Sequence, residues 1–159
     1  MSEKEPSRFQ SVEVGINPLK QGIKAPEYKT EGAVGFDFEA SEQVTIQPGE
    51  LGLVPTGLVF EVPEGYFLAI VPRSSTPRKF GLDMPHSIGV IDVDYSGPED
   101  EIFLQVRNFT DEEVVVNPGD RVGQGLIIPV VRANFVERDL SGNRTRGGFG
   151  TTGKGKGNV

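Results

Sequence analysis

The chain has no cysteine and only one histidine, His86. Without cysteine, disulfide bonds and cysteine-ligated metal sites are excluded. A single histidine argues against a multi-histidine metal site and against a Ser-His catalytic triad. For His86 itself, a structural or exposed role is favoured over catalysis. Any catalytic or metal-binding site in this chain must therefore use side chains other than thiols and paired imidazoles.

Long apolar runs are also missing. None approaches the roughly 20 residues of a membrane span, and the N-terminal MSEKEPSRFQ is charged, without the apolar centre of a secretory signal. With the lack of cysteine, this predicts a cytoplasmic location, the nucleus or an organelle being left open, and no membrane partner. A length of 159 residues, 36% of them hydrophobic and 25% charged, suits one soluble domain.

Charge is distributed unevenly along the chain. Acidic residues stop at Asp139, and Arg144, Arg146, Lys154 and Lys156 then give the tail +4, which leaves −11 for the rest of a chain of net charge −7. An acidic body argues against a nucleic-acid partner, which usually needs a basic face. The tail either binds one compact anion or is a solvated segment that keeps the protein soluble.

Strand patterns dominate the sequence. Short runs rich in β-branched and aromatic residues alternate with turn sequences such as PG at 48–49 and PGD at 118–120. This pattern is typical of an all-β sandwich, jelly roll or barrel. Pro55 and Pro129 lie inside apolar runs and predict edge positions or bulges, because proline cannot donate to a sheet ladder. The expected strands are 11–16, 51–62, 66–72, 87–95, 101–109, 113–116 and 125–131.

One short helix is expected within residues 74–82, beginning at Ser74 or Ser75 and terminated by Gly81. Arg73 precedes it. The guanidinium, the two hydroxyls and the free N–H groups of the helix start together make a good anion site. The alternative is an ordinary capped helix on the surface.

The stretch GVIDVDYSG holds two carboxylates. On a strand, Asp92 and Asp94 share a face with Val90, which is costly unless they are paired or used. They suit the water ligands of Mg²⁺, or a general base with a supporting group, and Tyr95 suits stacking on a sugar or base. Alternatively, both aspartates cap the turn at 96–98.

Two further stretches carry polar groups. In GDRVGQ, Gln124 is the one obvious polar side chain that could contact a ligand. Asp120 and Arg121 are expected to form a structural ion pair. The tail sequence GFGTTGK nearly matches a phosphate-binding loop but has no helix after it. Phe149 has no apolar neighbours there, so it suits packing on a nucleobase. We therefore expect a domain at 1–139 and a flexible Gly-rich arm at 140–159; a disordered tail is the alternative.

Taken in order, five stretches resemble the motifs of the trimeric deoxyuridine triphosphatase (dUTPase) family. The combination of PRSS, IDxDY and a terminal GGFG is more specific than any one motif. The resemblance implies a jelly-roll, or β-clip-like barrel, homotrimer with active sites shared between subunits. It also implies hydrolysis of dUTP to dUMP and pyrophosphate. The stretches are 32–40, 72–82, 89–97, 119–124 and 144–153.

The resemblance implies roles for single residues. Asp92 matches the catalytic base, and Asp37 and Asp94 are expected to support the site. Mg²⁺ is the implied cofactor, held by the triphosphate and waters and not directly by the protein. Contacts to uracil and deoxyribose are expected from His86, Ser87, Ile88, Gly89, Tyr95 and Phe149, and contacts to phosphate from Arg73, Ser74, Ser75, Gln124, Arg144, Gly150, Thr151 and Thr152.

Departures from the family pattern leave rivals to consider. Thr76 and Pro77 replace a common Leu-Ala, with little effect expected, and SGPEDE (96–101) lengthens a loop near the site. One rival is a bifunctional dCTP deaminase–dUTPase, but its catalytic Glu would fall near Gln105, which cannot act as a base. The other is a non-catalytic nucleotide-binding regulatory module, against which the intact Asp92 argues.

Overall fold

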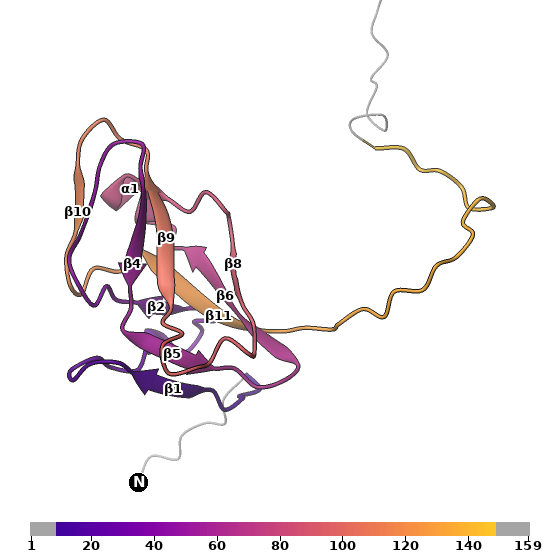
Figure 1. The fold of residues 1–159 in the computed structure, drawn as a ribbon, viewed down its shortest axis with the longest axis horizontal. Helices are drawn as coiled ribbons and strands as arrows, with labels where there is room; N and C mark the ends of the chain where they lie inside the picture. Colours follow the sequence, from indigo (N-terminus) through magenta and orange to yellow (C-terminus); the bar gives the residue numbers. More distant parts are fainter. Residues whose placement is uncertain (1–8, 149–159) are drawn as a thin grey trace, which may run out of the picture.

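The computed structural model describes residues 9–148, and within them the chain is almost entirely β-structure with one short helix (Figure 1). The expected fold class is confirmed. The elements are β1 (Gly15–Pro18), β2 (Phe36–Phe38), β3 (Val44–Ile46), β4 (Leu51–Pro55), β5 (Leu58–Glu61), β6 (Tyr66–Pro72), α1 (Thr76–Phe80), β7 (Leu82–Asp83), β8 (Gly89–Ile91), β9 (Phe103–Asn108), β10 (Val114–Val116) and β11 (Gly123–Pro129).

The strands form four small antiparallel sheets, and most pairings join segments far apart in sequence. The largest sheet has the order β2-β11-β6-β8, and the next has the order β4-β9-β7. β1 pairs with β5, and β3 with β10. In the largest sheet, β11 lies between β2 and the seven-residue β6, which has β8 on its other edge. This arrangement is the jelly-roll-like fold that the sequence predicts.

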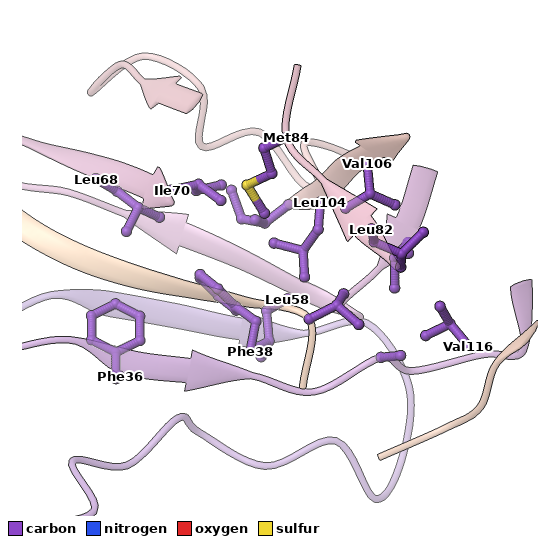
Figure 2. Close-up of a cluster of buried hydrophobic side chains, with 14 of the residues drawn as sticks. Phe36, Phe38, Leu58, Leu68, Ile70, Leu82, Met84, Leu104, Val106 and Val116 are labelled. Atoms are coloured by element: carbon purple, nitrogen blue, oxygen red, sulfur yellow. The ribbon is translucent and has the colours of Figure 1, made fainter. Parts of the chain in front are cut away.

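The core forms where the inward faces of these sheets meet (Figure 2). β9 shows how the sequence produces it, since Leu104, Val106 and Asn108 are buried. The alternate residues are more open, with Phe103 and Arg107 exposed and Gln105 half-buried. This is the period of two that a half-buried strand requires. Three aromatic rings, Phe36, Phe38 and Phe60, stack or meet edge to face at the end of the core nearest β2 and β5.

Strand predictions were best for long apolar runs. β6 has the predicted bounds. The run 51–62 is interrupted at Thr56-Gly57, where the chain leaves β4 and enters β5. The strand expected at 11–16 is displaced, since β1 overlaps it only at residues 15 and 16, and the strand expected at 87–95 is reduced to β8. β2, β3 and β7 were not predicted. Pro55 lies on β4, an edge strand, as predicted for a residue that has no backbone N–H to donate.

Beyond β11 the described chain has no further helix or strand. Residues 130–148 run away from the body as an extended segment, orange to yellow in Figure 1. Its apolar side chains are open to solvent, with Val131 93% and Phe135 92% exposed. A domain boundary at residue 139 stays a prediction. The expected arm residues Phe149, Gly150, Thr151 and Thr152 lie outside the described residues.

Gly125 gives a test of this packing. It pairs with Phe36 across β11 and β2, and a Cβ there would lie 2.5 Å from Phe36 Cε2 and 2.8 Å from Phe38 Cε2. We expect Gly125→Ala to lower the free energy of unfolding by about 1 to 3 kcal/mol, because the rings have no room to move aside. Urea denaturation measures this. Gly142→Ala, which meets nothing within 4 Å, is the control, and equal midpoints for the two variants would contradict the expectation.

Candidate functional site

The predicted anion-binding stretch is the turn that joins β6 to α1. Gly81 ends the helix in the left-handed conformation (φ 66°), with its N–H bonded to the carbonyl of Pro77. Ser75 is the N-cap residue, as predicted, but its backbone is helical and its side chain makes no capping hydrogen bond. The capping role expected of this hydroxyl is therefore wrong. Ser74 is exposed and Ser75 half-buried.

Arg73 is the anchored member of this turn. Its Nε donates to Asp37 Oδ1 at 2.7 Å, and its Nη1 donates to the carbonyl of Arg121 at 3.2 Å. A guanidinium has five N–H donors, so three remain after these two bonds. With its side chain 25% exposed, Arg73 is held in one orientation and still offers donors to an anion.

Asp37, on β2, binds two arginines at once. Its Oδ2 accepts from Nη1 of Arg121 at 3.1 Å while its Oδ1 accepts from Arg73, and its side chain is 14% exposed. The supporting role predicted for Asp37 thus has a physical form, although that role itself stays a prediction. The predicted Asp120–Arg121 ion pair is wrong: Asp120 Oδ2 instead accepts from the backbone N–H of Asn117 at 2.9 Å. Adjacent residues diverge here because the tight turn before β11 uses Asp120 for its own closure.

Gln124 lies beside this cluster. In the sheet it is opposite Asp37 on one side and Val71 on the other. Its Nε2 donates to the carbonyl of Pro72 at 3.1 Å, directly before Arg73. The structure therefore brings the predicted residues Arg73, Asp37 and Gln124 together, and adds Arg121, whose role the sequence did not reveal.

The resemblance places the uracil site around residues 86–95, a segment that contains β8. β7 and β8 do not pair with each other, because β7 pairs with β9 and β8 with β6. Ser87 has φ 66°, the only positive φ of a non-glycine residue between positions 9 and 148. The N–H of Ile88 bonds back to the carbonyl of His86 at 2.8 Å, across this one residue. Turns of this kind are strained, and they hold backbone groups in unusual directions. His86, Ser87 and Ile88 are all exposed, and Gly89 begins β8.

Asp92 and Asp94 do not lie on a strand. β8 ends at Ile91, and the N–H of Tyr95 bonds to the carbonyl of Asp92 at 3.2 Å, which closes a turn. The strand placement is therefore wrong. The turn that replaces it spans 92–95, ahead of the expected turn at 96–98, and in the later turn it is Asp100 Oδ2 that accepts from the N–H of Gly97 at 2.7 Å. Both carboxylates are exposed. The Tyr95 hydroxyl donates to the carbonyl of Glu101 at 3.0 Å, so the longer loop holds the ring in place.

The register of β6 and β8 separates these groups. Gly89 is opposite Ile70, near the Arg73 end of β6, whereas Ile91 is opposite Leu68. Asp92 therefore emerges four or more residues back along β6 from Pro72, and at about 3.3 Å per residue this is more than 10 Å from the Arg73 turn. One chain does not place Asp92 and Tyr95 with Arg73 and Gln124. Arg144, in the extended segment, is exposed.

Within residues 9–148, no three His, Cys, Asp or Glu side chains converge in a way that could hold a metal ion. In the same residues, no helix has the length and apolar character needed to cross a membrane.

Known proteins match both this sequence and this fold. The deoxyuridine 5′-triphosphate nucleotidohydrolase of Lactococcus lactis is 45% identical over 149 residues, which are 92% of this chain and 99% of that protein. The crystal structure of dUTPase from Streptococcus mutans, 37% identical, has a TM-score of 0.69 and covers 76% of this chain and 99% of its own.

A more distant structure shows the same fold. The dUTPase of Staphylococcus bacteriophage 80alpha with dUPNHPP is 22% identical, with a TM-score of 0.76 over 90% of this chain and 99% of its own. The dUTPase family model matches residues 21–153. The chain therefore belongs to the dUTPase family and is a dUTP diphosphatase.

Proposed function

We propose that the chain hydrolyses dUTP by attack of water on the α-phosphorus, with Arg73, Ser74, Ser75 and Gln124 as phosphate ligands. The observation that carries this assignment is the guanidinium of Arg73, held by Asp37 and the carbonyl of Arg121 beside two serine hydroxyls. Planar guanidinium groups bind phosphate oxygens through paired hydrogen bonds. A pre-oriented donor set is what in-line attack on a triphosphate requires.

The reaction itself needs one base. Asp92 accepts a proton from the attacking water as its oxygen bonds to the α-phosphorus, and the bond from that phosphorus to the bridging oxygen breaks. dUMP and pyrophosphate leave. An exposed carboxylate at the start of a turn is able to meet a water molecule, and Asp94 follows in the same turn as a supporting group. The product dUMP supplies dTMP synthesis, and removal of dUTP limits uracil in DNA.

Mg²⁺ is part of the proposal as an ion that arrives with the triphosphate. The exposed carboxylates of Asp92 and Asp94 fit contact through metal-bound waters, which is how Mg²⁺ is often held beside phosphates. When bound, the ion neutralises charge on the triphosphate and on the leaving pyrophosphate.

Uracil and deoxyribose are proposed to bind at the segment 86–95 and against Tyr95. The strained turn at Ser87 is exposed, and the backbone of this segment is proposed to read the base edge. The Tyr95 ring, fixed through Glu101, lies under the sugar where a 2′-hydroxyl would clash. Phe149 is proposed to cover the base, and Arg144, Gly150, Thr151 and Thr152 to close on the phosphates.

A homotrimer with shared active sites is also proposed. Two features support it: the separation of Asp92 from Arg73 within one chain, and apolar side chains exposed on the outer face of β4 and β9. On that face Leu51 is 60%, Leu53 54% and Phe103 41% exposed, which suits an interface between subunits.

Light scattering in solution tests the assembly. We expect the mass of three chains, because one chain does not bring the two halves of the site together. The mass of a single chain, together with full activity, would contradict the shared site.

The function is tested by offering dUTP, dCTP, dTTP or UTP with Mg²⁺ and measuring pyrophosphate and ammonia. Pyrophosphate from dUTP alone is expected, because the segment 86–95 is proposed to recognise uracil and Tyr95 to reject a 2′-hydroxyl. Ammonia from dCTP would favour the bifunctional deaminase, and binding without turnover would favour the regulatory module.

Asp92→Asn tests the proposed general base in the same assay. It should keep the affinity for nucleotide and lose turnover by roughly 10²- to 10⁴-fold, the usual contribution of a general base. Near-normal turnover would show that the base lies elsewhere.

A further inference from the structure

Only three polar side chains are buried among the described residues: Thr56, Thr76 and Asn108. Buried hydroxyls and amides persist where their hydrogen bonds hold a particular backbone arrangement. Thr56 donates to the carbonyl of Ile102, and Asn108 donates to the carbonyls of Ile46 and Glu112. These three partners lie outside the candidate site. Thr76 is fully buried and bonds directly to a residue of that site.

Thr76 holds both backbone polar groups of Arg73. Its Oγ1 accepts from the N–H of Arg73 at 3.1 Å, and its own N–H donates to the carbonyl of Arg73 at 3.0 Å. The same hydroxyl donates to the carbonyl of Val122 at 3.0 Å. Thr76 therefore connects the turn after β6 to the chain that leads into β11.

The guanidinium of Arg73 is bound to that same segment. Its Nη1 reaches the carbonyl of Arg121, one residue before Val122, and its Nε reaches Asp37. Arg73 is thus fixed at its backbone through Thr76 and at its side chain through Asp37 and Arg121. If either attachment is lost, the remaining one no longer determines where the three open donors point.

We propose that Thr76 is a positioning residue for the triphosphate: its buried hydroxyl sets Arg73 for phosphate without touching the substrate. The proposal rests on the proposed function, in which Arg73 binds phosphate. Thr76 was expected to differ from Leu with little effect. In this chain, however, the Thr76 hydroxyl accepts from Arg73 and donates to Val122 at once, and an apolar side chain does neither. A displacement of about 1 Å at a reacting centre costs up to roughly 100-fold in rate.

The test compares Thr76→Val with Thr56→Val, each of which removes one buried hydroxyl without changing the size of the side chain. Three quantities are measured: kcat/KM for dUTP, the Kd of the α,β-imido analogue of dUTP, and the Kd of deoxyuridine. For Thr76→Val we expect kcat/KM and the analogue affinity to fall at least about tenfold, with the deoxyuridine affinity unchanged. For Thr56→Val we expect none of the three to change, although unfolding becomes easier.

Two more variants keep the test decisive. Thr76→Ser retains the hydroxyl and should restore kcat/KM to near the wild-type value. Thr76→Cys carries a weaker donor and acceptor of similar size, and should lose activity in the same direction if Thr76→Val does not fold.

Several results would overturn the inference. They are kinetics of Thr76→Val or Thr76→Cys that match Thr56→Val, an equal loss of analogue and deoxyuridine binding, or no recovery in Thr76→Ser. Failure of the proposed function is seen separately, because wild-type protein that does not release pyrophosphate from dUTP would contradict the function whatever the variants do.

Discussion

The candidate site depends on one carboxylate that binds two guanidinium groups. Arg73 follows β6 and Arg121 precedes β11, and their like charges would repel if they met without a partner. Asp37 accepts from both and is itself mostly buried. Two cations and one anion leave one net positive charge, with donors free on Arg73. The cluster is therefore rigid and still attractive to a phosphate.

The sheet order explains how this cluster forms. β2 supplies Asp37, β6 ends at Pro72 directly before Arg73, and β11 lies between them and carries Gln124. Side-chain bonds from Arg73, Thr76 and Gln124 to backbone carbonyls join the turn after β6 to the start of β11. The same sheet carries β8, but its antiparallel register sends Asp92 away from Arg73. This separation is the reason for proposing that a second chain completes the site.

Sequence patterns predicted the parts of this fold that local chemistry determines. β6 was predicted with its bounds because seven apolar residues end at Pro72, and Gly81 was recognised because only a left-handed residue ends α1 there. β2 was missed because three residues carry too little periodicity. Asp37 was matched to a family motif, but its two arginine partners are 36 and 84 positions away. The positive φ of Ser87 was also hidden, since serine seldom adopts it.

We propose above all that the cluster of Arg73, Asp37 and Arg121 orients the triphosphate so that water attacks the α-phosphorus. Hydrolysis of dUTP in ¹⁸O-labelled water tests it most directly, with mass spectrometry of both products. We predict one ¹⁸O atom in dUMP and none in pyrophosphate, because the bond between the α-phosphorus and the bridging oxygen breaks. Label in pyrophosphate and not in dUMP would place the attack on the β-phosphorus and contradict the account.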